Sequence, residues 1–139
     1  MKPVLAVTRR LPDAVAKRAA EHYDIRTQED DDPLSRNEIL TLCHGADAVL
    51  VSVGDPIDAA FFDALPDSVK IIATFSVGTD HIDLSAARKK GVIIGNTPGV
   101  LTDATADIAW LLILGAARRA SEGEAEVRND TWSSWRPTH

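Results

Sequence analysis

Short apolar runs, each followed by a segment with helical spacing, recur along about the first hundred residues of this 139-residue chain. Most of the runs contain few polar positions, so strands made from them would be buried on both faces, whereas the segment 23–27 would form a more exposed strand. We predict strands at 4–7, 23–27, 48–51, 69–75 and 92–95. Strands that alternate with helices in this way are typical of a parallel sheet covered on both sides. Five such units predict an α/β fold with a flavodoxin-like, doubly wound parallel five-stranded sheet.

Residues with helix-capping chemistry stand between the runs and support the alternation. Ser35 precedes Glu38 by three residues, which is the spacing of a capping box. Asp58 and Asp83 are placed to cap the third and fourth helices, and Gly91 is placed to end the fourth.

Residues 103–128 form one long helical pattern that differs from the earlier helices. Apolar residues between 108 and 117 surround this helix nearly on all sides. A helix of this kind needs partners on more than one side, and a single sheet covers only one of them. We therefore predict that something besides the sheet covers the helix, and that an irregular tail follows over 129–139.

Charge and cysteine content exclude several classes of protein. The net charge of −6 argues against nucleic acid as the main partner, because phosphate binding needs a positive field. Cys43 is the only cysteine, which leaves no intrachain disulfide and no cysteine-based metal cage. The N-terminus lacks the apolar core of a signal peptide, and the longest apolar run is too short for a membrane span. We therefore expect a soluble, cytoplasmic protein without a membrane partner.

Three loops rich in small residues follow the predicted strands, at 52–54, 76–79 and 96–99. In a doubly wound sheet, ligands bind beyond the carboxyl ends of the strands, where these loops would lie. Glycine lets the backbone approach a ligand closely, and successive free amides bind anions. A small carboxylate or phosphate is the ligand that such loops favour. The same residue types also suit plain strand-to-helix turns.

His81 suggests a catalytic alternative for the second loop. It could act as a general base oriented by Asp80, but adjacent side chains in a turn tend to diverge. We interpret Asp80 and Asp83 as turn and helix caps, and His81 as a packed or solvent-facing histidine. The histidines are scattered, and neither a metal-binding spacing nor a G-x-G-x-x-G fingerprint occurs, so we expect no metal site and no complete dinucleotide site.

The segment 76–119 resembles the D-isomer-specific 2-hydroxyacid dehydrogenases, and within them the glyoxylate/hydroxypyruvate reductase branch. VGTDHID, NTPGVLTDATAD and the later W-SSW-RP pattern carry the resemblance, and the opening KPVLAVTRRLP is similar too. The family's substrate domain is flavodoxin-like, in agreement with the pattern of strands and helices above. The resemblance implies an NAD(P)-dependent oxidoreductase that reduces a small 2-oxo acid to the 2-hydroxy acid by hydride transfer.

The resemblance also implies roles for particular residues. The backbone amides of Val77 and Gly78 would bind the substrate carboxylate, and Val53 and Gly54 would border the same pocket. Thr102 would lie near the cofactor cleft. The predicted substrate-binding residues and the one predicted cofactor-binding residue are, in order, Val53, Gly54, Ser76, Val77, Gly78, Thr79 and Thr102.

Members of this family carry their dinucleotide fingerprint and their catalytic arginine, glutamate and histidine beyond the W-x-x-W-x-P segment. We therefore predict no catalytic residue in this chain. The expected organisation is a substrate-binding domain over 1–100, a helix over 101–128 that links to a nucleotide-binding domain, and the tail over 129–139, with the Rossmann domain absent. NAD or NADP would bind the full-length enzyme and bind this chain poorly. The chain alone would be inactive, and a homodimer or higher oligomer is expected.

Two other interpretations compete with this one. A receiver-type signalling module has the same fold, and Asp55 roughly fits its phosphoacceptor. However, Arg9 and Arg10 stand where such a module has acids, and residues 96–98 stand where it has a lysine. A non-catalytic binding or oligomeric protein is the third interpretation, because an unpartnered apolar helix tends to associate.

Overall fold

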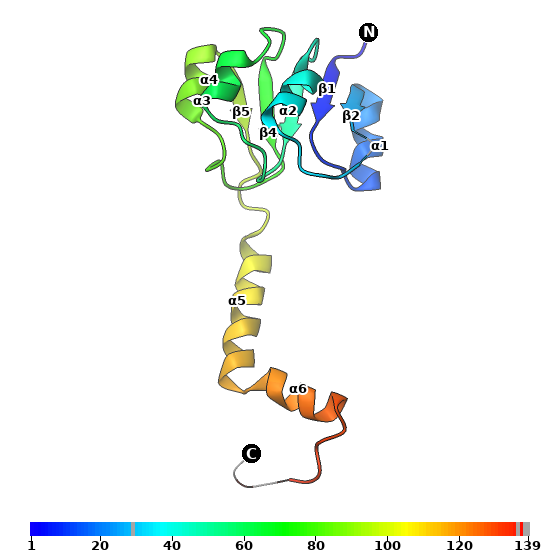
Figure 1. The fold of residues 1–139 in the computed structure, drawn as a ribbon, viewed down its shortest axis with the longest axis vertical. Helices are drawn as coiled ribbons and strands as arrows, with labels where there is room; N and C mark the ends of the chain where they lie inside the picture. The colour runs from blue at the N-terminus through cyan, green and yellow to red at the C-terminus, as the bar shows by residue number, and fades with distance from the viewer. Residues whose placement is uncertain (29, 136, 138–139) are drawn as a thin grey trace. The chain divides into compact units, whose positions relative to one another are not determined.

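A computed structural model describes residues 1–28, 30–135 and 137 of the chain. Its sheet contains five strands, all parallel, in the order β2-β1-β3-β4-β5 (Figure 1). This is the strand order of the flavodoxin-like doubly wound fold, so the predicted fold class is confirmed. The strands are β1 (Val4–Val7), β2 (Asp24–Thr27), β3 (Ala48–Val51), β4 (Ile71–Thr74) and β5 (Ile93–Gly95).

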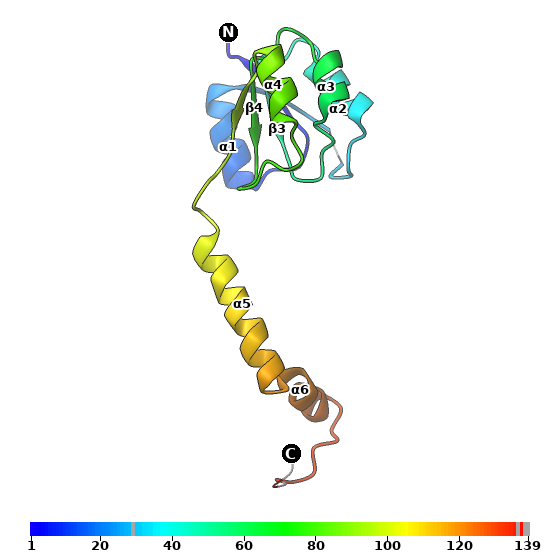
Figure 2. The same cartoon turned by 90° about the vertical axis from the view of Figure 1, so that its left-hand side faces the viewer.

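Four helices connect the strands and lie on both sides of the sheet. α2 contacts α3 and α3 contacts α4, so these three form one layer, whereas α1 lies against the opposite face (Figure 2). Right-handed crossovers produce this division, because the chain moves one way from β1 to β2 and the other way afterwards. The helices are α1 (Asp13–His22), α2 (Arg36–Cys43), α3 (Ala59–Ala64) and α4 (Leu84–Lys90).

The two faces of the sheet are buried to different extents. Val49 and Ile72 on the face toward α2, α3 and α4 are fully buried and belong to the main hydrophobic core. On the other face, Ile71 is 43% exposed and Ile93 is 64% exposed. The prediction that helices cover both faces is therefore wrong for this part of the sheet, because α1 packs near β2 and leaves β4 and β5 open on its side.

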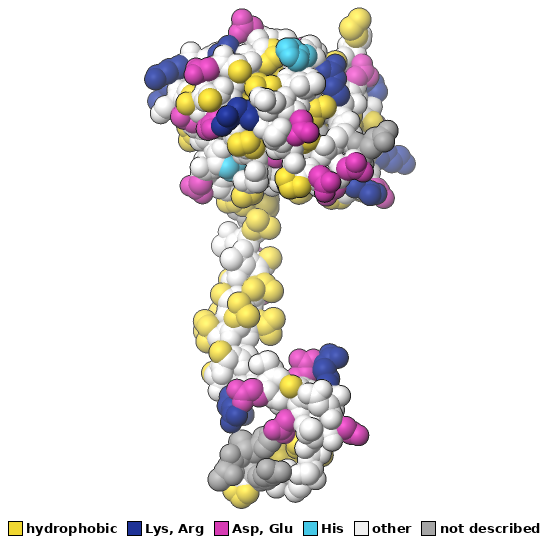
Figure 3. Space-filling model, viewed as in Figure 1, with side chains coloured by type: hydrophobic (Ala, Val, Ile, Leu, Met, Phe, Trp, Pro, Cys, Tyr) yellow, Lys and Arg dark blue, Asp and Glu magenta, His cyan; other side chains and the backbone are white. Residues whose placement is uncertain are grey.

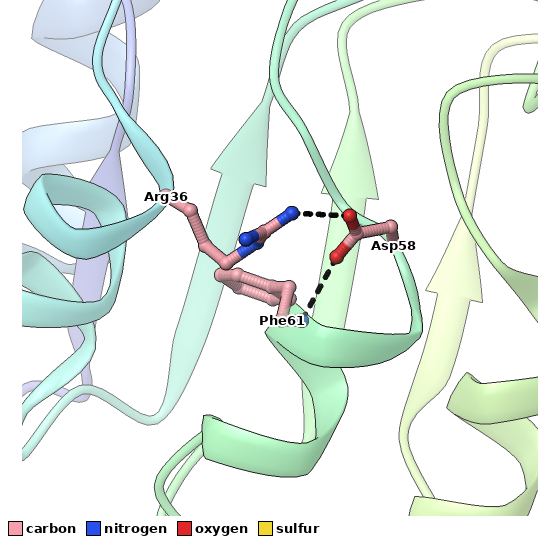
Figure 4. Close-up of polar contacts among 3 residues, drawn as sticks. All are labelled: Arg36, Asp58 and Phe61. Carbon is pink, nitrogen blue, oxygen red and sulfur yellow. Dashed lines mark hydrogen bonds and ion pairs between the residues drawn. The ribbon is translucent and has the colours of Figure 1, made fainter.

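Hydrogen-bonded caps fix where the helices begin, as the sequence predicts. Ser35 and Glu38 form both bonds of a capping box at the start of α2. Asp58 accepts a 3.0 Å hydrogen bond from the amide of Phe61 at the start of α3 and forms an ion pair with Arg36, which ties α2 to α3 (Figure 4). The Phe61 bond, followed by the Arg36 contact, lowers the pKa of Asp58.

The chain divides into two compact units, Met1–Gly99 and Val100–His139. The second unit contains α5 (Thr102–Ala117) and α6 (Ala120–Arg128), so the prediction of one continuous helix over this region is wrong. The break lies at Arg119, whose φ of 52° is left-handed. This conformation is uncommon for a residue with a Cβ, and an ion pair between Arg119 and Glu122 accompanies it.

The apolar side chains of α5 between Ile108 and Leu114 are exposed, and Figure 3 shows hydrophobic side chains gathered along the face of this helix that is in view. Trp110, Leu111 and Leu112 are each more than 60% exposed. After α6, the described residues of the tail form neither helix nor strand, and Trp132 packs edge-on against Trp135. Residues 136, 138 and 139 of the predicted irregular tail, and residue 29 of the acidic loop, lie outside the described residues.

Asp55 is a buried carboxylate that holds the turn after β3. Its Oδ2 accepts hydrogen bonds from the Thr8 hydroxyl at 2.5 Å and from the Ser52 amide at 2.7 Å. Its side chain is only 2% exposed, so solvent cannot replace either bond. This carboxylate therefore joins the carboxyl end of β1 to that of β3.

We predict that Asp55→Ala lowers the free energy of unfolding by about 2–3 kcal/mol, because it leaves the half-buried Ser52 amide without its acceptor and the buried Thr8 hydroxyl with only its longer, 3.3 Å contact to the Leu50 carbonyl. Urea unfolding followed by circular dichroism measures the change. Asp63→Ala, at an exposed position of α3, is the matched control and should change stability little. Equal stability of the two variants would contradict the role given to Asp55.

We predict that Cys43 resists alkylation in the folded chain. Its side chain is fully buried, and burial raises the pKa of its thiol to about 12, so almost no reactive thiolate exists near neutral pH. Mass spectrometry after iodoacetamide treatment should find unlabelled protein in native buffer and labelled protein in denaturant. Rapid labelling of the native chain would show that the α2 region opens readily.

A candidate anion-binding site at the carboxyl edge of the sheet

Loops that are distant in sequence meet at the edge of the sheet where the parallel strands end. β1, β3, β4 and β5 are neighbours in the sheet, so the loops that follow them are neighbours as well. The loops after β3 and β4 also pair beyond the strands, through a parallel bridge between Ile57 and Ile82. The predicted substrate-binding residues of the first two loops, 53–54 and 76–79, are thereby brought to one edge.

In the loop after β4, three consecutive backbone carbonyls are held by side-chain and backbone donors. The carbonyl of Ser76 accepts from the Thr97 amide at 3.0 Å and from the Thr97 hydroxyl at 2.9 Å. The carbonyl of Val77 accepts from Nδ2 of Asn96 at 2.8 Å. The carbonyl of Gly78 accepts from the hydroxyl of Ser76 at 2.7 Å. Every peptide oxygen from 76 to 78 is therefore occupied.

The amides of the same peptides are free. Within the described part of the chain, the N–H groups of Val77, Gly78 and Thr79 donate to no acceptor. Each of these N–H groups shares its peptide with one of the three held carbonyls, and a hydrogen bond to the carbonyl makes the N–H a stronger donor. We call these three N–H groups the amide cradle. Free, polarised amides in succession are suited to bind an anion.

Arg9, in the loop after β1, places a positive charge beside two further free amides in the loop after β3. Val53 and Gly54 are exposed, and their N–H groups donate to no described residue. The guanidinium of Arg9 lies beside Gly54, with Nη2 3.7 Å from where a Cβ of that glycine would stand. Arg9 is half-buried and donates to the carbonyl of Asp31 at 2.7 Å, which holds it in this position. This charge favours an anion at the same edge.

The structure partly confirms the interpretation of the acidic and histidine side chains in the loop after β4. Asp83 caps α4 by accepting from the amide of Ala86 at 2.9 Å, as predicted. His81 is half-buried, and its Nε2 lies 3.0 Å from the hydroxyl of Thr74, so it is a packed histidine. Asp80 makes no capping hydrogen bond among the described residues, and its Oδ2 instead lies 3.1 Å from where a Cβ of Gly78 would stand.

The phosphoacceptor interpretation of Asp55 is wrong. A receiver module needs an accessible carboxylate, whereas Asp55 is only 2% exposed: its Oδ2 is bonded to Thr8 and Ser52, and its Oδ1 is buried without a partner among the described residues. Arg9, by contrast, lies beside Gly54 at the carboxyl edge of the sheet, and its position in the sequence does not predict this.

Sequence analysis missed the residues that hold the amide cradle. In the loop at 96–99, the side chains of Asn96 and Thr97 donate to the backbone of the loop after β4. The buried hydroxyl of Thr74, at the end of β4, contacts Ser76 and His81. The sequence does contain a signal for Asn96 and Thr97, because two side chains with hydrogen-bond donors stand directly after the last strand. Only the pairing of β4 with β5 shows what they contact.

The predicted cofactor-binding residue lies at the start of the second unit. Thr102, the predicted cofactor-binding residue, is the first residue of α5 and is exposed, and no G-x-G-x-x-G occurs in the sequence. Among the described residues, no group of three His, Cys, Asp or Glu side chains could hold a metal ion. The helices in the described part of the chain are all too short or too polar to cross a bilayer.

Comparisons with known proteins agree with this geometry. A glyoxylate reductase from Thermococcus onnurineus is 42% identical over 99% of this chain, and a glycerate dehydrogenase from Hyphomicrobium methylovorum is 40% identical over 98% of it. In both cases the chain spans 42% of the relative's length. An NADPH-dependent glyoxylate/hydroxypyruvate reductase from Sinorhizobium meliloti, solved in complex with NADP and malonate, superposes with a TM-score of 0.77 at 28% identity, over 95% of this chain and 40% of its own.

The sequence model of one family covers nearly the whole chain. It is described as the catalytic domain of D-isomer specific 2-hydroxyacid dehydrogenases, and it matches residues 5–132. The strand order, the glycine-containing loops at the carboxyl edge and the similarity to solved reductases all fit this match. The chain therefore belongs to the D-isomer specific 2-hydroxyacid dehydrogenase family.

Proposed function

We propose that this chain supplies the substrate-binding portion of an NAD(P)H-dependent 2-hydroxyacid dehydrogenase of the glyoxylate/hydroxypyruvate reductase type. The enzyme would reduce a small 2-oxo acid to the 2-hydroxy acid. The names of the relatives support the substrate class, and the chain spans about two fifths of their length. The observation that carries the proposal is the amide cradle, because a 2-oxo acid always presents a carboxylate.

In this proposal, the substrate carboxylate accepts hydrogen bonds from the amides of Val77 and Gly78, with Thr79 beside them. Backbone amides hold an anion without a counter-charge, and they keep their direction because the carbonyls of the same peptides are held. Arg9 and the free amides of Val53 and Gly54 border the other side of the pocket. They attract the anion and limit the size of the group attached to the 2-oxo carbon.

The reduction itself needs groups that we do not place in this chain. NAD or NADP would supply the hydride in the full-length enzyme, as the NADP complex of the Sinorhizobium reductase suggests. The residues present here fit a carboxylate and do not fit a dinucleotide, so the chain by itself should bind the cofactor poorly. Its own contribution is to bind and orient the 2-oxo acid.

We also propose that the protein is a homodimer or a higher oligomer, and that α5 takes part in the contact. The exposed apolar side chains of this helix favour burial against another surface. The open face of β4 and β5 is a second apolar surface of the same kind.

We predict that glyoxylate binds to the amide cradle and that Asn96→Ala weakens this binding about 3- to 10-fold. The variant removes the donor that holds the Val77 carbonyl, and a hydrogen bond of this kind is worth about 1 kcal/mol. Titration of the ¹⁵N-labelled chain with glyoxylate, followed by NMR, should shift the amide signals of Val77, Gly78 and Thr79. Asn37→Ala, at an exposed position of α2, is the matched control. Shifts confined to other residues would contradict the proposed site.

We predict that Leu111→Glu combined with Leu114→Glu shifts self-association toward the monomer, because both side chains are exposed and apolar on α5. Static light scattering over a range of concentrations measures the mass. Val127→Glu makes the same kind of change on α6 and should leave the mass unchanged. A wild-type chain that remains monomeric at high concentration would count against the oligomer.

A further inference from the structure

His81 stands at the head of a chain of hydrogen bonds that ends at the amide cradle. Its Nε2 lies 3.0 Å from the hydroxyl of Thr74, and that hydroxyl lies 2.6 Å from the hydroxyl of Ser76. The Ser76 hydroxyl lies 2.7 Å from the carbonyl oxygen of Gly78. Thr74 and Ser76 are both buried, at 2% and 8% exposure, so water does not compete for these contacts.

Each hydroxyl in this series of hydrogen bonds has only one proton to donate, and this fixes the direction of every bond. A carbonyl oxygen only accepts, so Ser76 must use its single hydroxyl proton on Gly78. In the contact between the two hydroxyls, the donor must then be Thr74. Thr74 has no second proton, so in its contact with His81 the imidazole must donate. The ring is therefore protonated at Nε2, and all the bonds point toward the cradle.

The direction matters because the last acceptor, the Gly78 carbonyl, shares its peptide group with an N–H of the amide cradle. The carbonyl of Gly78 and the N–H of Thr79 are two ends of one peptide group. Hydrogen bonds that point the same way along a chain polarise one another, so the Nε2 proton of His81 strengthens the Thr79 N–H as a donor. The bond from Ser76 to Gly78 also fixes the turn in which Val77 lies.

From this arrangement we infer that His81 and Thr74 are positioning residues for the carboxylate site: through Ser76 they orient and polarise the Gly78–Thr79 peptide, with His81 in the Nε2–H tautomer. His81 does not touch the substrate and transfers no proton to it. The inference rests on the proposed function for what the cradle binds. The order of the bonds stands independently of the ligand.

The tautomer of His81 is the first test. Long-range ¹H–¹⁵N correlation spectra of the wild-type 139-residue chain, recorded at a pH where the ring is neutral, distinguish a protonated ring nitrogen from an unprotonated one. We expect Nε2 to be the protonated nitrogen and Nδ1 the unprotonated one. Protonation at Nδ1, or rapid averaging of the two tautomers, would overturn the inference.

Substitution of Thr74 is the second test. Thr74→Val keeps the shape of the side chain but removes the hydroxyl, so the His81 Nε2 proton loses its acceptor and the Ser76 oxygen loses its donor. We expect the tautomer preference to be lost, the Thr79 backbone nitrogen signal to move, and glyoxylate to bind about 3- to 10-fold more weakly. Thr74→Ser keeps the hydroxyl and should retain the wild-type tautomer and an affinity within about 2-fold.

Thr41→Val is the matched control. The Thr41 hydroxyl donates to the carbonyl of Asn37 inside α2 at 2.8 Å, so the same chemical change is made away from the loop. This variant should leave the His81 tautomer and the glyoxylate affinity unchanged. If Thr74→Val matches Thr41→Val in both measurements, the hydrogen bonds from His81 through Thr74 and Ser76 to Gly78 have no role in the site.

A pair of His81 variants covers the case in which Thr74→Val does not fold. His81→Gln offers an amide N–H toward Thr74, whereas His81→Leu offers no donor. We expect the glutamine variant to bind glyoxylate more tightly than the leucine variant, and equal affinities would overturn the inference. If the wild-type chain shows the Nε2–H tautomer and does not bind glyoxylate, the proposed function fails, but the inferred order of hydrogen bonds from His81 to Gly78 still holds.

Discussion

Parallel pairing of β1, β3, β4 and β5 brings the carboxyl ends of strands that are far apart in sequence to one edge of the sheet. Each loop that leaves this edge is short of main-chain partners, because the ladder of hydrogen bonds stops where the strands stop. The loops therefore form hydrogen bonds with one another. The Thr97 amide bonds to the Ser76 carbonyl, and Asp55 joins Thr8 to Ser52. The candidate site exists only because of this pairing.

Within the loop after β4, the carbonyls and the amides have different partners. The carbonyls of Ser76, Val77 and Gly78 are all bonded inside the protein, and the amides that follow them donate to no described residue. A negatively charged side chain, Asp80, lies close to Gly78, and a positively charged one, Arg9, lies beside Gly54. The candidate site thus combines free backbone donors with one charged side chain of each sign nearby.

Much of the fold could be predicted from short-range patterns. Strands form in all five predicted segments, and Ser35, Asp58 and Asp83 cap the helices that they are expected to cap. Two predictions were wrong. No glycine or proline marks the break at Arg119, so the pattern of helical residues runs through it. The apolar runs indicated two covered faces, but the face of β4 and β5 toward α1 is open among the described residues.

The sequence by itself determined the alternation of strands and helices, the capping residues and the presence of glycine-containing loops after β3 and β4, because local periodicity and local hydrogen-bonding chemistry specify these features. Only the tertiary structure decided what those loops do. Asn96 and Val77 are 19 residues apart, and Thr74 and His81 are seven apart, yet both pairs make hydrogen bonds. The order of the strands places these donors beside the right carbonyls, and that order depends on packing over the whole sheet, which no short stretch of sequence contains.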